Sequence, residues 1–403
     1  MAEVVIAGAG PAGAALGYLL AGRGVGVTLV ERHTDFAREF RGEGLMPSGV
    51  DALAQMGLAH AVACLSQTTI ETLVVYLGGR RLLRLALADL GIEGPRIVSQ
   101  PALLETLVAE AARFPGFRLE RGTTVRDLVL ASGRVVGVRV ESAAGAREVR
   151  ADLVLGTDGR ASVLRHRAGL HEVRTPQAFD LVWCKLPLPA WWSPRTTHAY
   201  LGGGHAALAF PSWDGRLQVG WIIQKGSFGE LRRLGLEGWL GVMAAHVAPD
   251  FAAHLRAART EATHPFLLDV VCDRLVRWTA PGLLLLGDAA HPMSPVGAQG
   301  INIALRDAVV AANRLVPALV PGAAPDVIDA AARQVQDERL PEVAAIQELQ
   351  QAPPRVLFDA SLAGRVILRA VLPLLVRLGL ARRLFGTVVR RFAHGVADVR
   401  LAV

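Results

Sequence analysis

Three glycines near the start of the chain have the spacing of a dinucleotide-binding turn. Gly8, Gly10 and Gly13 follow an apolar run, and Glu31 ends the next apolar run. The first glycine permits a tight turn, the second lets a pyrophosphate approach the backbone, and the third lets a helix pack on a strand. Glu31 could accept hydrogen bonds from a ribose hydroxyl. This motif predicts a dinucleotide site, but it does not distinguish FAD from NAD.

A second polar group follows the apolar residues 153–155. The turn at Asp158 and Gly159 would expose backbone N–H groups, Ser162 could cap a helix, and Arg165 could neutralise a phosphate. On its own this pattern is also typical of an ordinary turn.

The stretch 287–302, GDAAHPMSPVGAQGIN, is the most informative. Asp288 follows an apolar strand-like run and could hold a ribityl hydroxyl. Residues from Gly297 to Asn302 would leave free N–H groups at a helix start, where partial positive charge stabilises electron density on a reduced flavin. We expect His291 to be structural or a minor polar contact.

Taken together and in this order, the three motifs resemble those of the group A flavoprotein aromatic hydroxylases, the p-hydroxybenzoate hydroxylase family. The resemblance covers residues 1 to about 320. It implies an FAD-dependent monooxygenase that uses NAD(P)H and O2 to hydroxylate a small aromatic or polyketide-like substrate through a flavin hydroperoxide. That family has no separate nicotinamide domain, and this sequence has no second Gly-x-Gly-x-x-Gly motif. NADH or NADPH is therefore expected to dock only transiently.

The resemblance also assigns site residues. Backbone at Pro295 and Gly297 would face the flavin, Arg41 would approach the diphosphate, and Gln100 would touch the cofactor. Arg41 could instead be a surface cation, and Gln100 could act at the helix start. The predicted cofactor set is Gly8, Gly10, Ala12, Gly13, Glu31, Arg32, Arg41, Gln100, Val125, Asp158, Gly159, Asp288, Gly300, Ile301 and Asn302.

The predicted substrate contacts lie on segments of strand-like character: Trp183, His198, Tyr200, Trp221 and Gln224. Strand alternation puts only half of such positions on a cavity face, so core packing is the alternative for each of them. We predict no metal site and assign no catalytic base.

The elements that must position these residues form an α/β fold. Strands at 4–7 and 25–30 with a helix at 14–23 make one βαβ unit, and a strand at 283–286 and a helix at 300–315 rejoin it. We predict a Rossmann-like FAD-binding domain with an inserted antiparallel-sheet substrate domain and a C-terminal helical region. The predicted boundaries are 1–76, 95–175 and 275–340 for FAD, 77–94 and 176–274 for substrate, and 341–403 for the helical segment, with helix breaks at Pro341, Pro353–Pro354 and Pro373.

Composition narrows the class of protein further. With 52% hydrophobic and 20% charged residues, the 403-residue chain is an ordered globular protein. The net charge of +7 equals the excess of eight arginines over one aspartate after residue 359, so it does not indicate nucleic-acid binding. We expect these C-terminal helices to pack on the catalytic domains, with weak membrane-surface contact as the alternative. Cys64, Cys184 and Cys272 form no paired motif, which favours the cytoplasm.

Two other activities are compatible with this fold. A flavin-dependent halogenase would need a Trp-x-Trp-x-Ile-Pro segment, whereas the nearest stretch, Gly220–Lys225, lacks the second tryptophan and the proline. A dehydrogenase or reductase that never transfers oxygen stays open. A membrane-associated flavoprotein is a further alternative, and the oligomeric state is not predicted.

Overall fold

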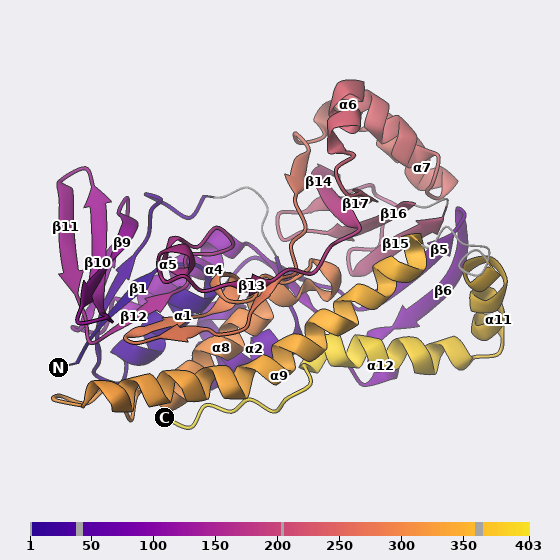
Figure 1. Ribbon diagram of the computed structural model, residues 1–403. Helices are drawn as coiled ribbons and strands as arrows, with labels where there is room; N and C mark the ends of the chain where they lie inside the picture. The colour runs from indigo at the N-terminus through magenta and orange to yellow at the C-terminus, as the bar shows by residue number, and fades with distance from the viewer. Residues whose placement is uncertain (1, 38–42, 203–204, 359–365) are drawn as a thin grey trace.

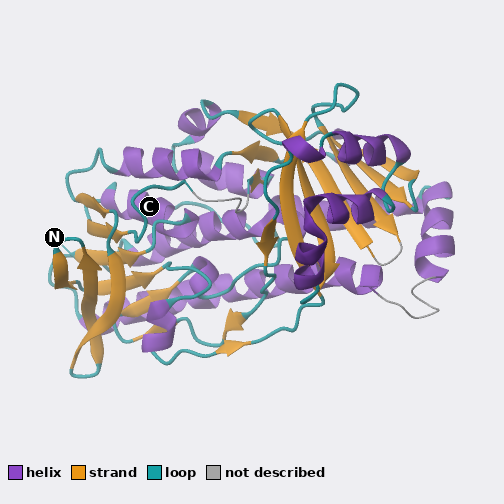
Figure 2. Ribbon diagram, turned by 90° about the horizontal axis from the view of Figure 1, so that it is seen from above, coloured by secondary structure: helices purple, strands orange, loops and turns teal. Residues whose placement is uncertain are grey.

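Two large β-sheets form the two halves of the molecule (Figures 1 and 2). The computed structural model describes residues 2–37, 43–202, 205–358 and 366–403. A sheet of mainly parallel strands lies in the half that contains the N-terminus, and a larger sheet lies in the other half. The long helix α9 (Pro325–Phe358) runs beneath the first half and reaches the second.

The first sheet is apolar and six-stranded. In spatial order its strands are β20 (Thr279–Ala280), β21 (Leu283–Leu285), β12 (Leu153–Gly156), β1 (Glu3–Ala7), β2 (Gly26–Val30) and β8 (Phe117–Glu120). All neighbours pair in parallel except β20 with β21. Buried apolar residues on β1, β12 and β21 are what a sheet covered on both faces requires.

Helices and a smaller sheet cover these strands. The helices are α1 (Pro11–Ala21), α4 (Gln100–Ala111) and α8 (Gln299–Leu315), and α1 packs between the other two. The small antiparallel sheet consists of β9 (Thr124–Ala131), β10 (Arg134–Ser142) and β11 (Gly145–Arg150) and packs against β1 and β12. The predicted fold class is confirmed.

The order of the strands explains why the three motifs meet. Strand β1 lies between β2 and β12, so the connections leave it in opposite directions and open a crevice at the carboxyl ends of the strands. The glycine motif follows β1, Asp158 follows β12, and Asp288 follows β21. Because β1, β12 and β21 are consecutive neighbours, all three motifs come together at one edge.

The second sheet has seven strands. They are β18 (Phe266–Leu268), β14 (Phe179–Pro187), β17 (Arg216–Gln224), β16 (His205–Pro211), β15 (Thr196–Gly202), β5 (Thr72–Leu77) and β6 (Arg80–Ala86). Helices α6 (Phe228–Ala244) and α7 (Pro249–Ala257) pack on one face of it. The predicted boundary at residue 77 is wrong, because all of β5 pairs with β15 and β6, and this sheet therefore starts at Thr72.

Short elements complete the described chain. Strands β3 (Gly44–Leu45) and β4 (Gln67–Thr69) both pair with β7 (Arg96–Val98), and β13 (Glu172–Val173) pairs with β19 (Arg274–Leu275). The helices α2 (Pro47–Gln55), α3 (Ala59–Ala63) and α5 (Val163–Arg167) pack on elements of the first half.

The C-terminal part is helical, but two predicted breaks are wrong. Helix α9 continues through Pro341 and Pro353–Pro354. A proline inside a helix loses one backbone hydrogen bond, and the buried contacts of Arg339, Glu342 and Val343 next to Pro341 hold this helix in place. Near Pro373 a π-helical turn, Ile367–Val371, leads into α11 (Leu372–Arg377), and α12 (Leu380–His394) follows.

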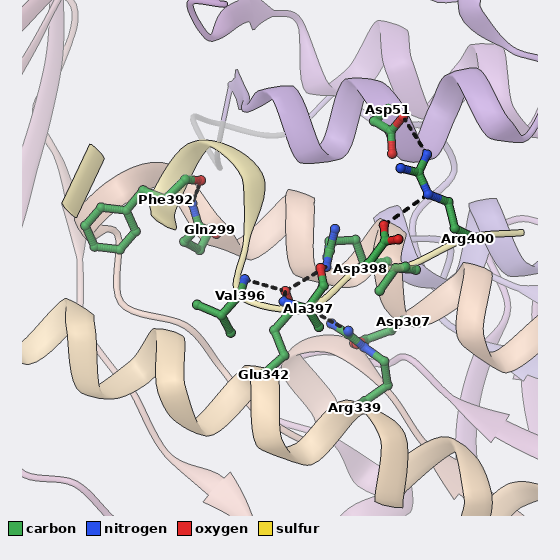
Figure 3. A network of polar contacts seen from close by, with 12 residues as sticks. Asp51, Gln299, Asp307, Arg339, Glu342, Phe392, Val396, Ala397, Asp398 and Arg400 are labelled. Atoms are coloured by element: carbon green, nitrogen blue, oxygen red, sulfur yellow. Dashed lines mark hydrogen bonds and ion pairs between the residues drawn. The ribbon is translucent and has the colours of Figure 1, made fainter. Parts of the chain in front are cut away.

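Five buried charged or polar side chains tie α8, α9 and the loop after β21 together. Asp307 accepts a hydrogen bond from Arg339 Nε at 2.8 Å, and its other oxygen lies 2.8 Å from His291 Nε2. Glu342 pairs with Arg339 and accepts hydrogen bonds from Arg306 at 2.7 and 3.1 Å (Figure 3). Burial alone would raise the pKa values of Asp307 and Glu342, but their cationic neighbours outweigh burial and hold both below their usual values.

Removing one cation from this network should destabilise the protein strongly. Arg339→Leu leaves buried Asp307 without its arginine and buried Glu342 with Arg306 alone, so we expect a loss of about 3–5 kcal/mol in the free energy of unfolding by urea. Arg314→Leu is the matched control, because its pair with Glu338 joins the same two helices at the surface and should contribute about 1 kcal/mol or less. Equal losses in the two variants would contradict the importance of the buried network.

The same network should make stability depend on pH. The folded protein lowers the pKa of both carboxyls below their ordinary values, 3.8 for Asp307 and 4.5 for Glu342. Their contribution to stability is therefore fully present at a pH above these ordinary pKa values, and it is lost as the pH falls through the lowered pKa values of the folded protein. The difference between wild type and Arg339→Leu should therefore shrink on acidification below about pH 4.5.

Candidate functional site

The glycine motif forms a tight turn between β1 and α1. Gly8 has φ +98°, and a Cβ there would lie 2.5 Å from the Thr157 carbonyl oxygen. Gly10 has no atom within 4 Å of its Cβ position, so its backbone is open to a ligand. Glu31 accepts hydrogen bonds from the Ala9 and His33 N–H groups at 2.9 and 3.0 Å, which joins this carboxylate to the turn.

Asp158 organises the second motif from within. Its two carboxylate oxygens accept hydrogen bonds from Ser162 Oγ at 2.6 Å and Leu164 N at 3.1 Å, and Ser162 caps α5 as predicted. Burial raises the pKa of Asp158 despite these bonds. Gly159 has φ +82° and open space where a Cβ would stand.

Arg165, which could neutralise a phosphate, is engaged within the protein. Its guanidinium donates to the carbonyl oxygens of Ala289 at 3.1 Å and Arg160 at 2.6 Å, and it lies 3.6 Å from Glu172. Arg165 therefore ties the second motif to the third.

Asp288 lies in a short 3-10 turn, Gly287–Ala289, that the buried network supports. The Gly287 N–H donates to Asp307 at 3.2 Å. The Asp288 side chain is 36% exposed and lies 3.3 Å from Arg160 Nε, so its carboxylate is accessible. His291 is buried against Asp307 and the Trp278 ring, a structural position as expected.

The loop from Pro295 to Ala298, which we call the flavin loop, is held by its carbonyl groups. Gln350 donates to the carbonyls of Ser294 and Val296, both at 2.7 Å. Gln299 donates to the Gly297 carbonyl at 2.6 Å, and Asn302 donates to that of Ala298 at 2.5 Å. The carbonyls are thus engaged inside the protein. Ala298 N donates to the Pro295 carbonyl at 3.1 Å and Val296 N to Ser294 Oγ at 3.5 Å, so Gly297 is the loop residue whose N–H could serve a ligand.

The backbone of this loop is strained at the start of α8. Gly297 has φ +74° and Ala298 has φ +54°, a left-handed conformation that is rare for alanine. Such strain costs about 1–3 kcal/mol per residue and concentrates at functional sites. Ala298 is nevertheless exposed. Contacts of the neighbouring backbone, and not burial of its own side chain, therefore hold it in this conformation.

Asn302 joins the flavin loop to the segment before α2. It donates to the Gly44 carbonyl at 3.1 Å and accepts from Met46 N at 2.9 Å. A Cβ on Gly44 would lie 3.0 Å from that of Ala298. Arg41, predicted to approach the diphosphate, lies outside the described residues.

The other predicted cofactor residues vary in position. Gln100 opens α4, where Ser99 is the cap. Arg32 is exposed and donates to His33 at 3.0 Å, whereas Val125 and Ile301 are buried. Gly300 has open space at its Cβ position, and Ala12 is buried in α1. Contact of these residues with a cofactor stays a prediction.

A buried polar cluster between the two sheets was missed from the sequence. Lys185 Nζ on β14 lies 2.7 Å from Asp214 and 3.5 Å from Glu43. Glu43 also accepts hydrogen bonds from Ser212 Oγ at 3.0 Å and Trp213 Nε1 at 3.1 Å, and burial keeps its pKa raised even so. The signal for this cluster was a lysine next to apolar residues in the strand-like segment Leu181–Leu186.

The predicted substrate residues divide between the two faces of the large sheet. Tyr200 and Trp221 are only 2% and 1% exposed and stack on Phe251 and Trp239, under α7 and α6. Their predicted substrate contact is wrong, because strand alternation turns them away from the flavin loop.

His198 shares the face of Tyr200 and packs on the Trp192 ring at 3.9 Å. Burial lowers the pKa of His198 to about 4. Trp183 lies on the opposite face, where Val296 of the flavin loop packs against the same apolar cluster. Gln224 lies beside Phe179 at the exposed end of that face.

The residues present fit a bound FAD. Gly10, Gly159 and Gly300 offer open backbone where phosphates can approach, and Asp288 offers an accessible carboxylate. The parallel sheet, the crevice at its switch point and the loop at the start of α8 define a flavoprotein.

Comparison with known proteins agrees with this class. Residues 1–347 match the family described as FAD binding domain, and the chain belongs to that family. The 6-methylpretetramide 4-monooxygenase of Streptomyces rimosus is 33% identical over 99% of this chain and 94% of its own length. The rifampicin monooxygenase of Streptomyces venezuelae is 27% identical over 76% of this chain and 62% of its own length.

Solved structures share the fold. PqsL of P. aeruginosa superposes with a TM-score of 0.76 at 24% identity and covers 89% of this chain and 97% of its own. The p-nitrophenol 4-monooxygenase PnpA of Pseudomonas putida DLL-E4 superposes with a TM-score of 0.78 at 19% identity. The match covers 99% of this chain and 100% of the PnpA chain. The chain is a group A FAD-dependent monooxygenase, an oxidoreductase for which NAD(P)H is the typical co-substrate of the family.

Loss of the Asp288 carboxylate should weaken FAD binding. A hydrogen bond to a charged acceptor contributes about 1.5–3 kcal/mol, so Asp288→Ala should raise the dissociation constant roughly 10- to 100-fold in a flavin fluorescence titration. Asp127→Ala is the matched control, because Asp127 is similarly exposed and lies 3.5 Å from one arginine, Arg167. Unchanged affinity of Asp288→Ala would show that this carboxylate does not hold the cofactor.

Proposed function

We propose that this monooxygenase hydroxylates an aromatic ring of a polyketide-like substrate, with NAD(P)H and O2 consumed together. The observation that carries the proposal is the 33% identity to a 6-methylpretetramide 4-monooxygenase over nearly the whole of both chains. A likeness of that extent covers the substrate sheet and the C-terminal helices as well as the FAD-binding part.

The face of the large sheet toward the flavin loop supports an aromatic substrate. Trp183, Leu208, Phe210 and Ile222 share this face in the strand register and are all half-buried. The Trp183 and Phe210 rings meet edge to face with centroids 5.9 Å apart. Flat apolar rings pack well against such a surface, so we propose these residues in place of Tyr200 and Trp221.

The chain's own groups have three tasks in this reaction. When bound, FAD supplies the redox chemistry, taking hydride from NAD(P)H and passing one oxygen atom from O2 to the substrate. The flavin loop and the first turn of α8 direct N–H groups and partial positive charge to the cofactor. The substrate sheet orients the ring and keeps water out.

With its proper substrate the enzyme should place one atom of isotope-labelled dioxygen on an electron-rich aromatic carbon. Mass spectrometry of the product from a panel of phenols and aromatic polyketides measures this incorporation, with NAD(P)H consumption followed in parallel. An unproductive substrate is the control, because it should release hydrogen peroxide without labelled product.

Turnover in which NAD(P)H consumption matches product formation, but the product carries no label, would contradict hydroxylation. It would favour the dehydrogenase alternative, which leaves the oxygen count of the substrate unchanged. Hydrogen peroxide formation alone does not distinguish the two activities.

We propose in addition that the C-terminal helices touch an anionic membrane surface weakly. Exposed apolar side chains gather there: Val366, Ile367, Val371, Leu374, Leu378 and Leu380. Arg377 and Arg383 are exposed beside them, and the sequence has no acidic residue from 360 to 397. Among the described residues, no helix is both long and apolar enough to span a bilayer. The three free cysteines support a cytoplasmic location for this contact.

This surface can be tested with vesicles. The holoenzyme should sediment with phosphatidylglycerol vesicles at low salt and be released at high salt, because the attraction to arginines is screened. The double variant Leu374→Glu and Leu378→Glu should lose binding, whereas Leu130→Glu, an equally exposed position on β9, should keep it. No sedimentation of wild type at low salt would rule out the contact.

A further inference from the structure

The flavin loop is backed by an aromatic side chain from the far end of the chain. A Cβ on Gly297 would lie 2.5, 2.7 and 2.8 Å from three atoms of the Phe392 ring. The ring therefore lies directly against the Gly297 backbone, so only glycine fits between it and the loop. Gln299 donates to the Gly297 carbonyl at 2.6 Å. It also donates to the Phe392 carbonyl at 2.9 Å (Figure 3).

Phe392 belongs to an apolar cluster at the junction of all three parts of the molecule. The cluster contains Met46, Leu87, Ile92 and Ala393. Val296 of the flavin loop packs against it and also against the cluster around Trp183 on the substrate sheet. The flavin loop is thus enclosed by the substrate sheet on one side and by α12 on another.

The chain after α12 is held firmly along the first half of the molecule. Glu342 accepts hydrogen bonds from Val396 N at 3.1 Å and Ala397 N at 3.3 Å, and Arg306 donates to the Ala397 carbonyl at 2.6 Å (Figure 3). Asn313 then holds Ala402, and Gln55 holds Leu401. The segment that follows Phe392 is therefore held in place by several hydrogen bonds.

We propose that Phe392 is a positioning residue for the flavin, acting through Gly297 to set where the flavin loop meets the isoalloxazine ring. Residues 348–403 lie outside the part that matches the FAD-binding family, so this role belongs to the C-terminal segment of this chain. The inference rests on the FAD site and not on the identity of the substrate.

A double-mutant cycle on the two positions tests the contact. In the Phe392 background, Gly297→Ala should weaken FAD binding about tenfold and shift the visible absorption of the bound flavin, because the new methyl meets the ring. In the Phe392→Ala background the same change should alter FAD affinity less than about threefold. The left-handed strain at residue 297 is present in both backgrounds and cancels in the comparison.

Phe392→Ala alone should shift the visible absorption and the midpoint potential of the bound flavin away from those of wild type. Phe392→Leu should keep both close to the wild-type values. Phe251→Ala is the control, since it removes a fully buried ring of α7 and should lower the melting temperature without changing the flavin spectrum. Should Phe392→Ala fail to fold, Phe392→Leu takes its place in the cycle. Equal effects of Gly297→Ala in both backgrounds, or a wild-type spectrum and potential in Phe392→Ala, would overturn the proposal.

Discussion

The buried ion network between α8 and α9 is the interaction on which the rest of the site depends. Burying two arginines and two carboxylates costs several kcal/mol per ion unless each finds a partner. Here each does, since Arg339 bridges Asp307 to Glu342 and Arg306 completes the pairing. The same carboxylates also accept backbone hydrogen bonds, from Gly287 before Asp288 and from Val396 and Ala397 after α12. One network therefore positions both the third motif and the C-terminal segment.

The flavin loop shows how that rigidity is used. Its left-handed residues would relax in an isolated peptide, because alanine disfavours φ +54°. Side chains from α8 and α9 hold the carbonyls of Val296, Gly297 and Ala298 and that of the preceding Ser294, and α12 closes the remaining side. The strain is thus maintained by elements that are far apart in sequence.

The large sheet has two faces with different tasks. The face under α6 and α7 is a core of stacked aromatic rings, including Tyr76, Tyr200 and Phe251. The other face is half-buried and meets Val296. The Lys185 and Glu43 cluster at its edge joins the sheet to the segment that also touches Ala298, which couples substrate domain and flavin loop mechanically.

The sequence by itself determined the FAD site in outline. The glycine turn, Asp158 and Asp288 each follow an apolar strand, and local turn chemistry requires little beyond that strand and the following helix. The fold class and the cofactor followed from those motifs.

The tertiary structure alone decided what depends on contacts between distant segments. The register of the large sheet places Trp183 and Tyr200 on opposite faces. Alternation within one strand could not predict this, because the two residues lie on different strands whose pairing the sequence does not give. Propensity places a break at Pro341, yet buried pairing keeps α9 continuous. Phe392 and Gly297 lie 95 residues apart in the sequence. No local pattern encodes their contact, because a buried phenylalanine has the same sequence signature in any amphipathic helix.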